Sequence, residues 1–188
     1  MLNWIIEIDY AVQQYVLSTH QEMYIGFWNV LTSLACKEAI IVFALIAMGI
    51  FLYKKNWLRT LELLVITIGT AGTVLIMKFL INRVRPIGSF VLETGPSFPS
   101  WHAAAAIMFF GFVFFVLAGA VKNRYTRIGM HVLGMILIVL EPISRLALNV
   151  HYSSDVLAGL VIGAVWLIFG EKVYQYFERA EPKLSNME

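Results

Sequence analysis

Three short polar clusters interrupt an otherwise apolar chain, and together they carry the side chains needed to hold a phosphate group and attack it. A charged side chain at membrane depth costs roughly 2.5–3.5 kcal/mol on insertion scales, so charges inside apolar segments indicate function. The clusters consist of Lys78 and Arg85, of Ser100, Trp101 and His102, and of Ser144, Arg145, His151 and Asp155. If these side chains meet in one water-facing pocket, their cations, imidazoles and carboxylate suit phosphoryl transfer.

The first cluster is suited to binding an anion. Lys78 and Arg85 are seven residues apart, so they share one face of a helix that Pro86 terminates. A guanidinium grips phosphate through two parallel hydrogen bonds, whereas an ammonium acts as a point charge. Snorkelling to the membrane surface is the alternative, and it suffices for Arg83, which we treat as an accessory residue. It explains Lys78 poorly, because Lys78 lies a turn or more inside the helix.

The second cluster begins an apolar helix. Ser100 is a favourable N-cap residue, and the backbone N–H groups that follow it point outward at the positive end of the helix dipole. Such helix N-termini bind anions readily. His102 lies in the first turn, where its ring can face a bound anion. An ordinary capped helix with an interfacial tryptophan and histidine is the alternative.

The third cluster holds a possible nucleophile. His151 and Asp155 are four residues apart at the start of the last apolar segment, so their side chains can touch. A carboxylate bonded to one imidazole nitrogen fixes the tautomer and leaves the other nitrogen free as a nucleophile or base. Ser144 and Arg145 precede this pair across a short loop. For the pair alone, a charge at a helix N-terminus beside an interfacial histidine is the alternative.

The composition places these clusters in a membrane protein. Hydrophobic residues make up 60% of the 188 residues and charged residues only 14%, whereas soluble domains carry about 25% charged residues. Five apolar stretches can each provide the roughly 20 residues of a membrane crossing: 28–53, 60–82, 101–121, 127–146 and 154–176. The sequence therefore predicts an all-α, polytopic membrane bundle of five to six transmembrane helices, forming one domain over residues 1–188.

Residues 1–20 predict an amphipathic helix that lies in the membrane interface. Their apolar side chains fall on one helical face, while polar side chains such as Glu7 and Gln14 fall on the other. A sixth crossing by this segment is the less favoured alternative, because Glu7 and Asp9 would then enter lipid.

The distribution of lysine and arginine predicts the orientation. Basic residues gather after the first span (Lys54, Lys55, Arg59) and after the third (Lys122, Arg124, Arg127), which places both loops in the cytoplasm. The loops with the polar clusters, 83–100 and 147–153, then lie on the outer side. We therefore expect a multi-pass protein of the cell membrane with an extracytoplasmic site. The net charge of only +2 gives no support for nucleic-acid binding.

The sequence pieces KFLINRVRP, PSWH and SRLALNVHYSSD resemble the signature of the type 2 phosphatidic acid phosphatase superfamily, whose pattern is KxxxxxxRP, PSGH and SRxxxxxHxxxD. The resemblance covers residues 78–155 and departs at one defining position, where Trp101 replaces glycine. Glycine lets the backbone approach a ligand closely, and tryptophan either narrows the pocket or turns toward lipid. We expect activity to survive this replacement and substrate preference to change.

The resemblance implies a mechanism and the roles of the residues. His151 would attack phosphorus and form a phosphohistidine, Asp155 would orient His151, and His102 would protonate the leaving oxygen. The residues expected to bind the substrate phosphate are Lys78, Arg85, Ser100, Trp101, Ser144 and Arg145. We expect no metal ion or other cofactor, because carboxylates are scarce around these residues.

The expected substrate is a lipid phosphate held in the bilayer. We rank undecaprenyl pyrophosphate first, with phosphatidylglycerol phosphate, phosphatidic acid and a lipid A phosphate as alternatives. A lipid transporter or a binding protein is the alternative from another class, although transporters usually have broken helices near the midplane or repeated halves. No obligate protein partner is expected.

Overall fold

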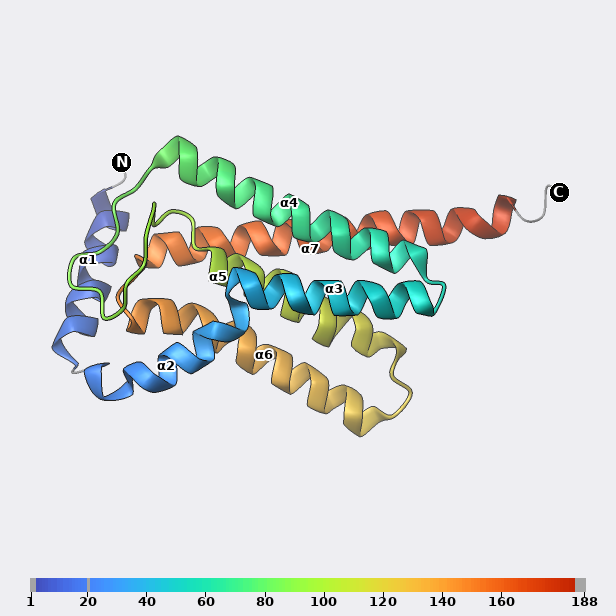
Figure 1. Ribbon diagram of the computed structural model, residues 1–188, viewed down its shortest axis with the longest axis horizontal. Helices are drawn as coiled ribbons and strands as arrows, with labels where there is room; N and C mark the ends of the chain where they lie inside the picture. The colour runs from blue at the N-terminus through green and yellow to red at the C-terminus, as the bar shows by residue number, and fades with distance from the viewer. Residues whose placement is uncertain (1–2, 20, 185–188) are drawn as a thin grey trace.

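The computed structural model describes residues 3–19 and 21–184, and within these ranges every regular element is a helix (Figure 1). In chain order the elements are α1 (Asn3–Ser18), η1 (Gln21–Tyr24), α2 (Ile25–Thr32), η2 (Ser33–Ala35), α3 (Lys37–Tyr53), α4 (Trp57–Ile81), α5 (Trp101–Ala105), η3 (Ala106–Phe110), η4 (Phe112–Val116), η5 (Leu117–Ala120), α6 (Arg124–Ala147) and α7 (Ser153–Leu184). The predicted all-α bundle is confirmed. Residues 1–2 and 20, at the ends of the predicted interfacial segment, lie outside the described residues.

Four helical stretches are long and apolar enough to cross a membrane: Trp57–Ile81, Trp101–Ala120, Arg124–Ala147 and Ser153–Ala180. The stretches Ile25–Ala35 and Lys37–Tyr53 make a fifth if they are counted as one span, and they meet at an angle of 41°. The sequence predicted one continuous helix here. The helix breaks at Cys36 because its backbone is extended (φ −64°, ψ 157°) and its Sγ caps α3 by accepting a hydrogen bond from Ala39 N.

Helix α1 lies across one end of the bundle, crosswise to the long helices (Figure 1). Trp4, Ile8 and Tyr15 are exposed on its outer side, which agrees with a helix that presents an apolar face to the membrane interface. The inner side buries Asp9 and Val16. A buried carboxylate needs compensating donors, so Asp9 marks a polar contact between α1 and the bundle.

The third span occupies the centre of the bundle. It starts as α5, continues through the wider π-helical turns η3 and η4, and ends in η5. Ala103–Ala106, Met108 and Phe112 have no exposed surface. The segment contacts α3, α4, α6 and α7, so its first turn is held from several sides.

Two glycines let α7 approach α5 closely. A Cβ at Gly159 would lie 2.4 Å from the carbonyl oxygen of Ser100, and one at Gly163 would lie 2.3 Å from that of Ala104. Small residues four apart are a common device for close helix packing in membranes. Because Ser100 and Ala104 flank His102, this contact places the second polar cluster against the helix that carries the third.

We expect Gly163→Leu to lower the thermal stability of the protein in detergent. Overpacking typically costs about 1–3 kcal/mol, and here the obstructing atoms are backbone, which cannot move aside like the end of a side chain. The midpoint of thermal unfolding measures the effect. Gly49→Leu is the matched control, because Gly49 is exposed on α3 and a Cβ there would meet nothing within 4 Å. Equal midpoints for the two variants would contradict the close-packing role.

Candidate active site

The three polar clusters meet at the end of the bundle that α1 crosses. They come from the end of α4 and the loop after it, the first turn of α5, the last turn of α6, and the start of α7 with the residues before it. Together they line a cavity of about 760 Å³. The predicted site residues in this lining are Lys78, Arg85, Trp101, His102, Arg145 and His151.

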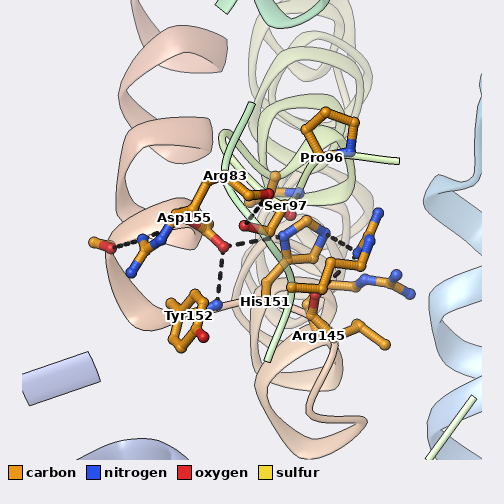
Figure 2. Close-up of polar contacts among 12 residues, drawn as sticks. Arg83, Pro96, Ser97, Arg145, His151, Tyr152 and Asp155 are labelled. Atoms are coloured by element: carbon orange, nitrogen blue, oxygen red, sulfur yellow. Dashed lines mark hydrogen bonds and ion pairs between the residues drawn. The ribbon is translucent and has the colours of Figure 1, made fainter. Parts of the chain in front are cut away.

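Asp155 lies behind His151 and out of the cavity lining (Figure 2). The two side chains are buried, and Asp155 Oδ2 is 3.5 Å from His151 Nδ1. This distance is long for a hydrogen bond but short enough for a strong electrostatic interaction. Tyr152 N donates to the same carboxylate oxygen at 3.0 Å, which fixes the carboxylate relative to the ring. His151 Nε2 faces the other way and lies 3.4 Å from Arg85 Nη1.

The surroundings of His151 favour its neutral form. Burial lowers the pKa of His151 to about 4, although the Asp155 carboxylate acts in the opposite direction. A neutral imidazole carries a free lone pair, so at neutral pH this side chain is ready to act as a nucleophile or base.

Lys78 and Arg85 are held by backbone carbonyls. Lys78 Nζ donates to Pro96 O at 2.5 Å. Arg85 Nε donates to Gly95 O at 3.0 Å, and its Nη1 donates to Val150 O at 2.9 Å. Burial lowers the pKa of Arg85, although the Glu93 carboxylate acts in the opposite direction. Both cations are therefore fixed in place before any anion arrives.

Arg145 is almost fully buried and has partners that the sequence did not reveal. Its Nη1 donates to Thr32 Oγ1 at 2.9 Å, and its Nη2 contacts the Glu93 carboxylate. Glu93 also lies 3.6 Å from Arg85 Nη2. Burial acts to raise the pKa of Glu93, but Arg145 and Arg85 lower it below its usual value. Thr32 is the last residue of α2 and lies just before the break between α2 and α3, which no local sequence pattern predicted.

The serine hydroxyls are used within their own helices. Ser100 caps α5 as predicted, with its Oγ accepting from Ala103 N at 3.5 Å. Ser144 Oγ donates to Glu141 O at 2.6 Å. Ser100 and Ser144 are both fully buried and lie outside the cavity lining. Trp101 lines the cavity and also packs against the hydrophobic core. Its Nε1 has no hydrogen-bond partner among the described residues.

Arg83 and Asp9 are the supporting residues that sequence reasoning undervalued. The sequence alone marks Arg83 as an accessory residue, yet its Nη1 lies 2.8 Å from Asp155 Oδ1 and its Nη2 lies 2.8 Å from Asp9 Oδ2. One sequence signal was available: Asp9 falls on the same helical face as Ile5, Val12 and Val16, where an acid is out of place.

The cavity is lined mainly by cations and imidazoles where the clusters meet. Within residues 3–19 and 21–184, no group of three or more His, Cys, Asp or Glu side chains is arranged to hold a metal ion. The donors that converge here are N–H groups, which bind oxyanions.

Known proteins resemble this chain in sequence and in fold. The model of the PAP2 superfamily matches residues 59–179. Phosphatidylglycerophosphatase B of Bacillus subtilis (strain 168) is 30% identical over 143 residues, covering 72% of this chain and 69% of that protein. The crystal structure of a transmembrane PAP2 type phosphatidylglycerolphosphate phosphatase from Bacillus subtilis aligns with a TM-score of 0.82 at 25% identity, covering 93% of this chain and 88% of that one. Aquifex aeolicus LpxE aligns with a TM-score of 0.65 at 19% identity over 86% of this chain and 93% of that one, a likeness of fold.

Proposed function

We propose a mechanism for this chain, which belongs to the PAP2 superfamily and is a membrane lipid phosphatase. In this proposal the protein removes the terminal phosphate of a bilayer lipid through a phosphohistidine on His151 and without a metal ion. One observation supports this most strongly. His151 is buried, with Asp155 behind Nδ1 and the cationic cavity in front of Nε2.

The proposed reaction has two steps. In the first, His151 Nε2 attacks phosphorus, the bond from phosphorus to the leaving oxygen breaks, and His102 gives that oxygen a proton. Asp155 stabilises the positive charge that develops on the His151 ring. In the second, His102 takes a proton from water, the water oxygen attacks phosphorus, and the P–N bond breaks to release phosphate.

The cations around His151 bind the phosphate group. Lys78, Arg85 and Arg145 hold the non-bridging phosphate oxygens and offset the charge that builds up in the transition state. Because backbone carbonyls, Thr32 and Glu93 already orient these side chains, little reorganisation is needed when phosphate binds. The N-terminus of α5 adds backbone N–H groups beside His102.

The shape of the cavity supports a lipid substrate. Below the polar residues, the same cavity is lined by Ile40 and Ile41 of α3 and by Val74 and Leu75 of α4. Ile41 and Leu75 are also exposed on the outside of the bundle. A phosphate head can therefore bind among the cations while its tail leaves sideways between α3 and α4.

Phosphatidylglycerol phosphate is the first substrate to test, because the Bacillus subtilis sequence match and the Bacillus subtilis crystal structure are both named for this activity. Undecaprenyl pyrophosphate, ranked first from the sequence, is the second candidate, since the lateral opening also suits a polyprenyl tail. The basic residues Lys54, Lys55, Lys122 and Arg124 lie at the opposite end of the bundle from the cavity, which supports an extracytoplasmic active site.

Phosphate release in the presence of EDTA tests the proposal. We expect the purified protein to hydrolyse lipid phosphates at an undiminished rate in the chelator, with a panel of the two candidate lipids and phosphatidic acid ranking the substrates. Activity that EDTA abolishes and a divalent metal restores would overturn the metal-independent histidine mechanism. Binding of these lipids with no phosphate release would instead favour a transporter or binding protein.

A further inference from the structure

Among the residues that the structure describes, the most completely bonded carboxylate outside the cavity belongs to helix α1. Asp9 is only 2% exposed, and its oxygens accept four hydrogen bonds. Ser153 Oγ donates at 2.6 Å, Ser154 N at 2.8 Å, Ser154 Oγ at 2.6 Å and Arg83 Nη2 at 2.8 Å. Asp9, which belongs to α1, therefore caps the N-terminus of α7. That N-terminus, at Ser153, lies two residues before Asp155.

Arg83 connects Asp9 to the catalytic pair. Its guanidinium bridges the two carboxylates, with Nη1 at 2.8 Å from Asp155 Oδ1 and Nη2 at 2.8 Å from Asp9 Oδ2. The same group lies over the ring of Tyr152, 4.0 Å from its centroid, and Nη1 also donates to Ser154 Oγ at 2.7 Å. Figure 2 shows Asp155 between Arg83 on one side and His151 on the other.

We infer that Asp9 is a positioning residue for the proposed reaction: by holding Arg83 and the first turn of α7, it sets where Asp155 lies and how much of its negative charge His151 experiences. The inference rests on the proposed function of His151. The interfacial helix α1 is then part of the support of the active site, in addition to lying at the membrane surface.

The charges distinguish this role from simple docking of α1. Asp9 partly neutralises Arg83, which leaves the charge of Asp155 available to His151. Without the Asp9 charge, Arg83 acts more strongly on Asp155, so His151 becomes harder to protonate. Without Arg83, Asp155 acts fully on His151, which becomes easier to protonate. A docking role alone gives no such opposite shifts.

The other charged groups near His151 are the same in the wild-type protein and in variants of Asp9 and Arg83. Burial acts to raise the pKa of Asp9, but the hydrogen bonds from Ser153, Ser154 and Arg83 bring it below its usual value. The titratable and charged groups around His151 are Lys78 from α4, Arg85 and Glu93 from the following loop, His102 from α5, Arg145 from α6 and Asp155 from α7.

The test compares full-length Asp9→Asn, Arg83→Met and the double variant in detergent, with kcat, KM and the pH dependence of kcat/KM on phosphatidylglycerol phosphate. We expect each single change to lower kcat about 10- to 100-fold with little change in KM, as for other residues that orient an active-site group. The double variant should be no slower than Arg83→Met alone, because Asp9 acts through Arg83. The acidic limb of the pH profile of kcat/KM should move to lower pH in Asp9→Asn and to higher pH in Arg83→Met.

Val16→Ala is the matched control for docking, since Val16 is buried on the inner side of α1 and carries no charge. It should lower the thermal midpoint while the pH limb stays in place. Losses in kcat that multiply in the double variant would overturn the positioning role of Asp9 and leave the proposed function standing. Acidic limbs that move in the same direction in the two single variants would do the same. A wild-type protein that releases no phosphate would overturn the proposed function, and the positioning role with it.

Discussion

Replacing His151 with alanine will lower phosphate release by roughly 10⁴-fold or more, because the variant loses the nucleophile while the rest of the site remains. Lipid binding should persist, since Lys78, Arg85 and Arg145 take their partners from the backbone, Thr32 and Glu93. The loss should therefore appear in kcat and leave the dissociation constant of the lipid nearly unchanged.

The phosphohistidine itself can be trapped. Wild-type protein quenched during turnover of a lipid labelled in its terminal phosphate should carry acid-labile, base-stable label, and His151→Ala should carry none. His131→Ala is the matched control, because His131 stacks on Phe115 with ring centroids 5.1 Å apart and does not line the cavity. Labelled protein in the His151→Ala variant, or activity within a factor of about ten of wild type, would show that another group is the nucleophile.

Arg145→Ala will lower kcat/KM by about 10²–10³-fold, the usual loss when a fixed donor to a developing oxyanion is removed. Arg145→Lys should recover only part of this loss, because an ammonium keeps the charge but lacks the planar pair of donors. The cost in stability should stay below the roughly 3–5 kcal/mol of a fully buried broken ion pair. Glu93 is 29% exposed and keeps Arg85 at 3.6 Å, so its charge remains compensated.

Arg59 provides the control for this prediction. Arg59 is also a poorly exposed arginine with carboxylate partners, 2.6 Å from Glu62 and 2.7 Å from Glu171, but it lies at the opposite end of the bundle. Arg59→Ala should lower the thermal midpoint and leave kcat/KM largely intact. If both arginine variants lose stability and activity in parallel, Arg145 has a structural role and not a phosphate-binding one.

The helices and their membrane character follow from local properties of the chain. A run of about 20 apolar residues favours a crossing wherever it occurs, so the long spans were predictable within a few residues. The spacing within the polar clusters also predicted which side chains share a helical face, because residues four or seven apart do so whatever the tertiary fold. The amphipathic pattern of the first residues likewise predicted the helix α1.

Contacts between distant segments were not predictable in this way. Asp9 and Arg83 are 74 residues apart, and Arg145 meets Thr32 across 113 residues. Their pairing depends on which faces the packed helices turn toward one another. The same is true of the break at Cys36, which an apolar run of that length does not suggest.

The sequence alone thus determined the membrane-spanning helices and the set of candidate site residues, since hydropathy and helical periodicity depend on residues that are close together in the chain. Only the tertiary structure decided which of those side chains face the cavity: Ser100 and Ser144 direct their hydroxyls into their own helices, while Glu93 reaches the arginines. The direction of a side chain and the partner of a buried charge depend on how helices pack, and packing joins residues that no local pattern connects.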